Sequence, residues 1–581
     1  MMIASLIGQL ERISNMALGS LYKCSRCQLQ VGGDLEDAVF EELTALWKSN
    51  VPPTSEKESR TEYTATSYAL KAIESQIREL SASMKSLKST RARMAEKKRL
   101  YRYILHPIRR LPPEILTEIF RIRTFGDIDL NDTEYPGSLD TRKAPWMLGQ
   151  VCRAWRSVAA STPSLWAKIN VSWWRDTISA SCALSLEALL SIQLKRSQDQ
   201  HISLSLETSD DRLQQKFLSM LCSRASQWRT ARLKSSIDSL NCLRDFRGAF
   251  RSLKLLEIRF IPVSDVWTSD GISPLCAFED CPSLTELKLR GKSPILLQRG
   301  ARIPWRQVIR YEARSGNRWL EEPGSHSQIL PKLERVEVCV LDSISNNETA
   351  TLQLLPSPLK LCFLHTLVIN IADSPGMDSL LSWLVLPALC VLRLVTGFSH
   401  PEKLVEFLDR SQCSLEELAI TLECYKEHSD EFPHNLTCLL EASALHNLRT
   451  LQIRVRFGSD GSREIWEMVI ETLRLGREGR AQAMPRLRRL VLNGEGFLNH
   501  TVTMGNEEVF LAMVSSRCFT TPPVSGRGGA FPLEELTLWN FGEEGTTPLE
   551  QFGMEHLMEL SSAGGLTCSW HWGRLDWRQV D

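Results

Sequence analysis

A short apolar pattern that recurs nine times between residues 253 and 538 constrains the fold more than any other feature of the chain. Each copy has an apolar residue, two others, a second apolar residue, one other and a third apolar residue. Several copies follow a proline or cysteine that marks a turn into a short strand, and helical patterns such as 401–410, 463–477 and 507–517 lie between copies. The pattern therefore predicts a strand and a helix in each repeat. The copies are Leu253/Leu256/Ile258, Leu284/Leu287/Leu289, Leu333/Val336/Val338, Leu364/Leu367/Ile369, Leu389/Leu392/Leu394, Leu415/Leu418/Ile420, Leu448/Leu451/Ile453, Leu487/Leu490/Leu492 and Leu533/Leu536/Leu538.

This arrangement resembles the leucine-rich repeat, in which stacked neighbours bury the strand leucines. The first leucines are 25 to 49 residues apart, more than in regular repeats, and the usual Asn after the motif is mostly missing, with Asn493 an exception. We therefore predict an irregular α/β solenoid over residues 176–581, with earlier strands at 201–206 and 229–234 and a disordered loop at 520–529. The tryptophans Trp570, Trp572 and Trp577 are expected to cap its last repeat. The residues between the leucines would face outward on the concave strand face and meet a partner, among them Glu257, Lys288, Glu337, Arg393, Gln452 and Val491.

Two short amphipathic helices are predicted between residues 108 and 169. The first begins near Pro112 and Pro113, which suit a first turn because a proline has no amide hydrogen to leave unpaired. Leu111, Ile115, Leu116, Ile119 and Phe120 then recur at steps of three and four and form one apolar stripe. The second helix follows the string PWMLGQVCRAWRSVA and ends before Pro163.

The pairing of LPPEILTEIF with VCRAWRSVA and PSLW resembles the F-box, and the longer string APWMLGQVCRAWRSVAASTPSLW resembles the F-box-like subfamily of mushroom-forming fungi. The resemblance implies docking on a Skp-type adaptor and so on a cullin-RING ubiquitin ligase. Residues 121–144 form an insert where a compact F-box has a shorter connection. Trp155 and Trp166 are assigned to core packing, whereas Leu148, Val151 and Val158 fit either core or surface. The predicted adaptor-binding residues are Leu111, Pro112, Pro113, Ile115, Leu116, Ile119, Phe120, Leu148, Val151 and Cys152.

Upstream, we expect an N-terminal helical segment over 1–50, a polar linker over 51–65 and a coiled coil over 66–105. Apolar residues in the last of these alternate steps of three and four from Leu70 to Met94, broken by Arg91. Such a narrow seam needs a cover, which favours a homodimer over a fold back onto the N-terminal helices. The basic run from Lys97 to Arg110 is read as a solvated helix face, with a nuclear-localisation patch as the alternative.

Composition narrows the class of function. With 69 basic and 69 acidic side chains, the net charge gives no reason to expect nucleic acid or a membrane as partner. The sixteen cysteines are scattered, which suggests a reducing compartment and so a cytoplasmic or nuclear protein. The first twenty residues are amphipathic and do not resemble a signal peptide. No stretch is long and apolar enough to span a bilayer.

Motifs of catalysis are absent from the sequence. Cys24 and Cys27 form a lone CxxC with no histidine nearby, so neither a metal nor another cofactor is expected. No P-loop, GxGxxG, HExxH or GxSxG motif occurs, and we predict that the chain is not an enzyme. The prediction is a substrate receptor that links the ligase adaptor to a protein target held by the repeats. The alternative is a scaffold without a ligase, in which the F-box-like helices only cap the repeats.

Overall fold

The structure of the chain is a computed structural model. It describes residues 37–50, 52–125, 137–173, 180–208, 210–261, 274–291, 302–314, 326–342, 352, 357–370, 374–398, 400–424, 432–457, 462–476, 483–496, 507–518, 530–539 and 551–571. Contacts divide the chain into two units, Met1–Leu111 and Pro112–Asp581. Four predicted features lie outside the described residues: the helix near the N-terminus, the Cys24–Cys27 pair, the loop at 520–529, and Trp572 with Trp577.

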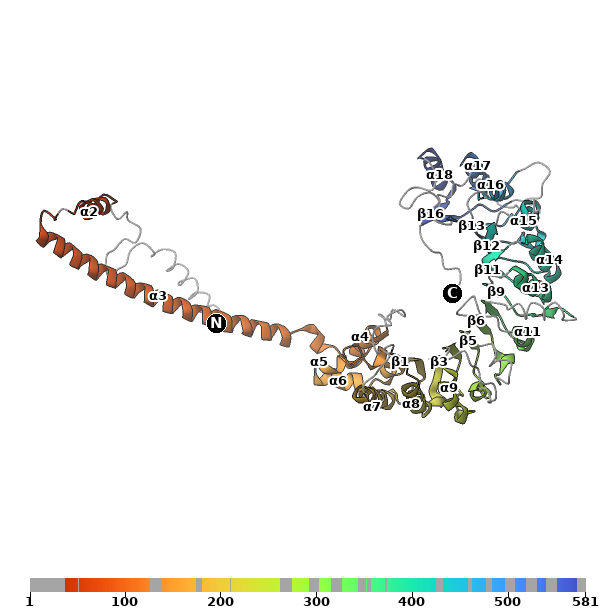
Figure 1. The fold of residues 1–581 in the computed structure, drawn as a ribbon, viewed down its shortest axis with the longest axis horizontal. Helices are drawn as coiled ribbons and strands as arrows, with labels where there is room; N and C mark the ends of the chain where they lie inside the picture. Colours follow the sequence, from red (N-terminus) through yellow and green to blue (C-terminus); the bar gives the residue numbers. More distant parts are fainter. Residues whose placement is uncertain are drawn as a thin grey trace. The chain divides into compact units, whose positions relative to one another are not determined.

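The first unit contains a long helix in the predicted coiled-coil region (Figure 1). Its described elements are α2 (Asp37–Ser49), α3 (Glu56–Ile104) and the 3-10 turn η1 (Pro107–Arg110). Glu56 and Glu58 lie in the first turn of α3 and Arg102 in its last, where each charge is favourable to the helix dipole. The helix begins at Glu56, so part of the segment 51–65 that was predicted to be a linker is helical.

The second unit alternates helices and strands. Its helices are α4 (Pro113–Phe125), α5 (Leu148–Val151), α6 (Arg153–Ala160), α7 (Ala180–Ser197), α8 (Asp211–Cys222), α9 (Ile237–Leu240), α11 (His326–Ile329), α13 (Ser374–Trp383), α14 (Pro401–Ser411), α15 (Phe432–Leu440), α16 (Ser462–Leu473), α17 (Glu507–Cys518) and α18 (Gln551–Gly564). The 3-10 turns are η2 (Gly137–Leu139), η3 (Pro163–Trp166), η4 (Ala225–Gln227), η5 (Asn241–Phe246), η6 (Pro274–Phe278), η7 (Trp305–Gln307), η8 (Leu330–Lys332) and η9 (Ser443–Leu445).

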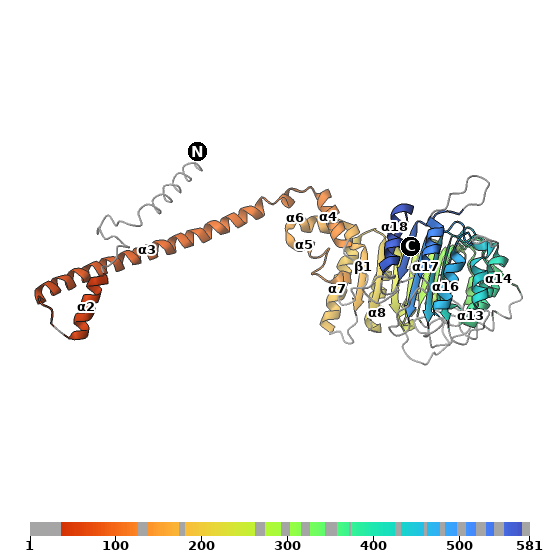
Figure 2. The same cartoon turned by 90° about the horizontal axis from the view of Figure 1, so that it is seen from above.

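The strands of this unit form one parallel sheet of fourteen, in chain order, plus a separate parallel pair of β8 and β10 among the described residues. The helices cover one face of the sheet (Figures 1 and 2). The strands are β1 (Lys168–Trp173), β2 (Ile202–Thr208), β3 (Trp228–Ser235), β4 (Leu255–Phe260), β5 (Glu286–Arg290), β6 (Arg310–Arg314), β7 (Val338–Leu341), β8 (Leu359–Lys360), β9 (Thr366–Ile369), β10 (Leu384–Val385), β11 (Val391–Phe398), β12 (Glu417–Cys424), β13 (Thr450–Phe457), β14 (Arg489–Gly496), β15 (Glu535–Trp539) and β16 (Thr567–His571).

Most copies of the apolar pattern place their last two residues on a strand of this sheet. In β4 and β5, for example, Leu256 is in register with Leu287 and Ile258 with Leu289, and all four are buried. Burying a leucine completely contributes about 1.5 to 3 kcal/mol. Because the buried residues continue from one strand to the next, they form a single core cluster along the unit.

The structure corrects the register of the third copy. In β7 the residues aligned with the neighbouring core positions are Cys339 and Leu341, so the strand uses Val336/Cys339/Leu341 in place of Leu333/Val336/Val338. Both registers place apolar residues at the required spacing, and the pairing of Tyr311 with Cys339 decides between them.

Two residues expected on the outward face are also placed differently. Glu337 precedes β7 and Val340 occupies its place in the row across the sheet, because the register is shifted. Val491 lies in the predicted row but is only 7% exposed. By contrast, Glu257, Lys288, Arg393 and Gln452 lie in that row and are half-buried.

Polar side chains of the helices bind backbone carbonyls at the ends of neighbouring elements. The clearest case is Arg517 of α17, which is fully buried. Its guanidinium donates hydrogen bonds to the carbonyls of Leu473 at 2.6 Å, Ala483 at 2.9 Å and Met484 at 3.3 Å. Burial lowers the pKa of Arg517 to about 10. This side chain ties α17 to the end of α16 and to the turn before β14.

Candidate adaptor-binding site

The helix α4 has one buried and one exposed apolar face. Leu116 is 5% exposed and Phe120 is fully buried, and the ring of Phe120 lies 5.0 Å from that of Trp155 on α6. The helix continues to Phe125, into the first residues of the predicted insert of 121–144. Leu116 and Phe120 thus hold α4 against α6 and are part of the core of this region.

On its other face, α4 presents three isoleucines to solvent. Ile115 is 48% exposed, Ile119 38% and Ile122 66%. Their steps of four and three residues place them on one side of the helix, so they form a continuous stripe. We call Ile115, Ile119 and Ile122 the isoleucine stripe.

The second predicted helix is broken in two at Cys152. This residue has an extended backbone (φ −158°, ψ 174°) between α5 and α6, and its Sγ accepts a hydrogen bond from the amide of Trp155 at 3.5 Å. The guanidinium Nε of Arg156 donates to the carbonyl of Gly149 at 2.8 Å, which links the two pieces. As a result Leu148 is buried, whereas Val151 is 58% exposed.

The described part of the predicted insert packs against the start of the sheet. Within it, the carbonyl of Ser138 accepts a hydrogen bond from Trp146 Nε1 at 2.8 Å, and its hydroxyl accepts one from the amide of Asn170 in β1 at 3.0 Å. The guanidinium of Arg142 bonds to both oxygens of Asp140 and holds the pKa of that carboxyl below its ordinary value. The described residues of the insert are therefore part of the fold: residues 121–125 finish α4, and η2 contacts β1.

A further set of contacts joins this region to the next helix. Gln193 of α7 donates to the carbonyls of Trp166 at 3.2 Å and Lys168 at 2.9 Å. The guanidinium of Arg196 lies 4.4 Å from the ring centre of Trp166, close enough for a cation–π contact. Because β1 also pairs with β2, the helices before the sheet and the sheet itself are one packed body.

The predicted adaptor-binding residues divide by exposure. Those exposed to solvent are Pro112, Pro113, Ile115, Ile119, Val151 and Cys152, while Leu111 is half-buried; those buried are Leu116, Phe120 and Leu148. Sequence reasoning missed two exposed apolar neighbours, Ile122 and Met147, which are 66% and 37% exposed. Ile122 had a signal, since it continues the spacing from Ile119 by three residues.

Comparison with known families decides what this region is. Residues 108–172 match the family model described as F-box-like. This segment is an F-box-like domain. No curated protein matches the chain. The F-box-like domain gives the chain a role in protein interaction, and the isoleucine stripe lies on its first long helix.

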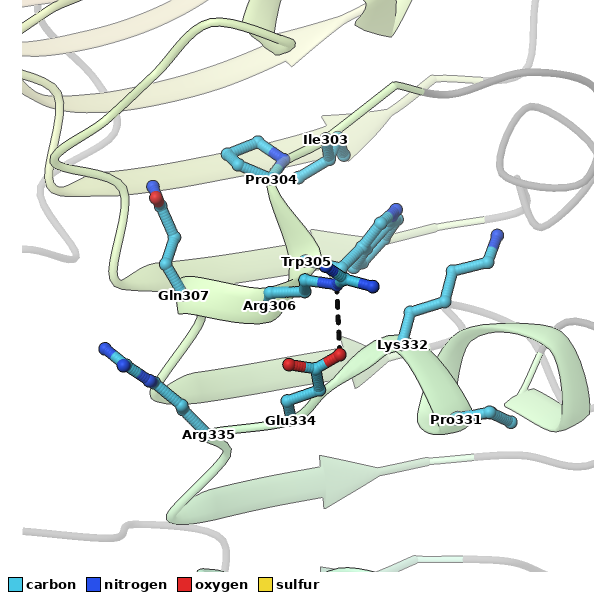
Figure 3. A pocket seen from close by; sticks show the side chains of 9 residues that line it. All are labelled: Ile303, Pro304, Trp305, Arg306, Gln307, Pro331, Lys332, Glu334 and Arg335. Carbon is cyan, nitrogen blue, oxygen red and sulfur yellow. Dashed lines mark ion pairs between the residues drawn. The ribbon is translucent and has the colours of Figure 1, made fainter.

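The second unit also carries a hollow of about 670 Å³ beside β6 and β7. Residues in and next to η7 and η8 line it. Among them, the side chain of Arg306 points toward Glu334 and pairs with it at 3.0 Å (Figure 3). Lys332 and Arg335 also line it, so cations outnumber carboxylates.

No metal centre or membrane segment emerges from the residues described. Among them, no three His, Cys, Asp or Glu side chains come close enough to hold a metal ion. None of the described helices combines the length and apolar character needed to cross a membrane.

Proposed function

We propose that the chain is an F-box substrate receptor, which links a Skp-type adaptor of a cullin-RING ubiquitin ligase to a protein target. The observation that carries the proposal is the isoleucine stripe on α4 of the F-box-like domain. Single exposed apolar side chains are ordinary, but an apolar stripe that no residue of the described ranges covers is typical of a surface that a partner covers. Leu116 and Phe120, on the buried side of the helix, already pack α4 against the domain.

The target-binding part of the proposal is the parallel sheet, which we infer to be an irregular leucine-rich-repeat solenoid. Its support is the order of the strands along the chain and the leucines in register between neighbours. On the face opposite the leucines, Arg232, Glu257, Lys288 and Glu312 form one row across β3 to β6. Further along, Val340, Val368 and Ala419 occupy the same row and are buried. Arg393 and Gln452, also in this row, are half-buried, whereas Arg232 at the charged end is exposed, which favours the charged end as the contact surface.

The charged end has internal ion pairs and an excess of cations. Glu312 is buried and receives Arg290 at 3.2 Å, Arg314 at 2.7 Å and Lys288 at 3.7 Å. Arg259 is exposed in the next row, between Lys234 and Arg290. We propose that this charged surface, formed by β3 to β6, contacts the target.

The mechanism we propose is proximity. A receptor that fixes its target beside a charged ubiquitin-conjugating enzyme turns a bimolecular transfer into an effectively unimolecular one. The chain needs no catalytic residue for this role, and we infer that it is not itself an enzyme. The proposal locates its action in the cytoplasm or nucleus.

The test is a binding measurement on the full chain with Ile115→Asp and Ile119→Asp together. Truncating a central interface anchor often costs about 2 kcal/mol or more, so affinity for a purified Skp-type adaptor should fall about 30-fold or more. A matched control is Leu184→Asp with Ile192→Asp on α7, whose side chains are 62% and 40% exposed and lie outside α4. The control should bind as the wild type does.

Unchanged adaptor binding by the α4 variant would contradict the proposal. So would a wild-type chain that binds no Skp-type adaptor, which would favour a scaffold whose F-box-like domain serves another interaction. Circular dichroism of both variants checks that the fold is retained.

A further inference from the structure

The helix α3 carries an apolar seam that nothing in the described structure covers. Among its 49 residues none is buried. At a rise of about 1.5 Å per residue, the seam from Leu70 to Met94 is roughly 36 Å long. Its members are Leu70 (56% exposed), Ile73 (36%), Ile77 (56%), Leu80 (69%), Met84 (55%), Leu87 (69%) and Met94 (62%). A seam of this width and period fits one partner helix.

The charges of α3 are strongly asymmetric. Residues 56–80 contain five glutamates and four lysines or arginines, so their net charge is 4 − 5 = −1. Residues 81–104 contain one glutamate and eight lysines or arginines, so theirs is 8 − 1 = +7. A second copy of this helix is therefore complementary in one orientation and repelled in the other.

A parallel pair in register is the unfavourable orientation. It places Arg91 against Arg91 and Lys98 against Lys98 within the seam, because both continue the alternating steps of the apolar positions. It also sets Lys97 beside Arg102 of the other helix at the seam's edge. The cationic halves would then lie side by side along their whole length.

An antiparallel pair removes these conflicts. With Leu80 opposite Met84, the seam also places Ile77 opposite Leu87 and Leu70 opposite Met94, so apolar residues meet apolar residues. In that register Arg91 faces Ile73, and Lys98 faces Thr66, so no like charges meet within the seam. At the edge, Glu74 of each helix lies beside Lys88 of the other, which gives two opposite-charge contacts by symmetry. The same spacing sets Arg60 beside Arg102 near the ends of the overlap, where Arg60 already pairs with Glu56 of its own helix at 2.6 Å. The overlap covers residues 60 to 104, nearly the full helix.

We propose that α3 associates with a second copy of itself as an antiparallel coiled coil. The C-terminal ends of the two helices then lie roughly 66 Å apart, at about 1.5 Å per residue over the overlap. Each end continues into one F-box-like domain. The dimer thus attaches its two receptor modules at opposite ends of a shared rod.

The first test is the mass of the full chain by light scattering. The wild type should have twice the chain mass. Ile77→Lys with Leu80→Lys should have the mass of one chain, because it places two charges in the seam from each of the two helices. The matched control is Ser75→Lys with Ala82→Lys, which adds the same charges to the outer face of α3. It should stay dimeric. A monomeric wild type would overturn the proposal and indicate that the seam is covered within one chain.

The second test fixes the orientation with a zero-length carbodiimide cross-link, read by mass spectrometry on a mixture of ¹⁴N and ¹⁵N chains. The antiparallel register predicts a Glu74–Lys88 link between differently labelled chains. Within one helix these residues are roughly 21 Å apart, too far for such a link. A dimer that lacks this mixed-label link, or that survives the two lysines in the seam, would overturn the proposal. Both tests are independent of adaptor binding, which concerns α4.

Discussion

Leu116 and Ile115 are neighbours in α4, but replacing each by alanine should have very different effects on the stability of the F-box-like domain. Leu116 is 5% exposed, so Leu116→Ala removes a packed side chain and leaves a cavity, a change that typically costs 2 to 5 kcal/mol. Ile115 is 48% exposed, so about half of its surface already contacts solvent in the folded chain. Ile115→Ala should therefore cost about 1 kcal/mol or less.

Hydrogen exchange of peptides from α4 measures this difference directly in the full chain, where a single melting curve would average over two units. A loss of about 2 kcal/mol speeds exchange through local opening roughly 30-fold, whereas about 1 kcal/mol speeds it roughly fivefold. Leu116→Ala should show at least the larger effect, and Ile115→Ala at most the smaller one. Equal acceleration by both variants would refute the division of α4 into a core face and a binding face.

Three further predictions concern the rest of the second unit. Arg517→Met leaves three buried carbonyls without a donor and should lower the free energy of unfolding by about 2 to 4 kcal/mol, seen in denaturant unfolding followed by tryptophan fluorescence. Gly137→Ala should lower the melting temperature, since Gly137 has φ +57° and an added Cβ would lie 2.2 Å from the carbonyl oxygen of Asn170. Burial raises the pKa of the Cys339 thiol to about 12, so at pH 8 iodoacetamide should label exposed Cys152 and leave Cys339 unmodified in the folded chain. Below pH 9 both the folded and the unfolded chain keep the Cys339 proton, and between pH 9 and 12 only the folded chain does. Stability should therefore fall as the pH rises through this range, and it should fall less in Cys339→Ala.

The strand positions were largely predictable from sequence because strand leucines recur at a fixed spacing. The leucine spacing does not predict a strand where other residues fill the same core positions. In β6 the core positions are Tyr311 and Ala313, which interrupt the pattern, and β7 offers two registers with equal apolar content. Only the pairing with neighbouring strands separates those registers.

The F-box-like helices were also predictable, but not which side of them is buried. Ile115 and Leu116 are both apolar and belong to the same sequence stripe, and the position of Trp155 against Phe120 determines that Leu116 turns inward. The break at Cys152 was missed because its flanking residues keep helical spacing across it. Backbone conformation at one residue leaves no trace in apolar periodicity.

The contacts between the F-box-like domain and the sheet determine how adaptor binding and target binding can be tested separately. A cut near residue 175 would leave β1 without its partner β2 and would remove Gln193 from the carbonyls that it binds. Point variants of the full chain therefore separate the two roles more cleanly than fragments do.

The most direct test of the proposed receptor function is affinity purification with mass spectrometry of three full-length chains. The wild type should recover the adaptor, the cullin and a target protein. Ile115→Asp with Ile119→Asp should lose the first two and keep the target, whereas Arg232→Glu with Arg259→Glu, on the charged surface of β3 to β6, should lose the target and keep the ligase subunits. If the α4 variant instead recovered the adaptor and cullin at wild-type levels, the central claim would be contradicted.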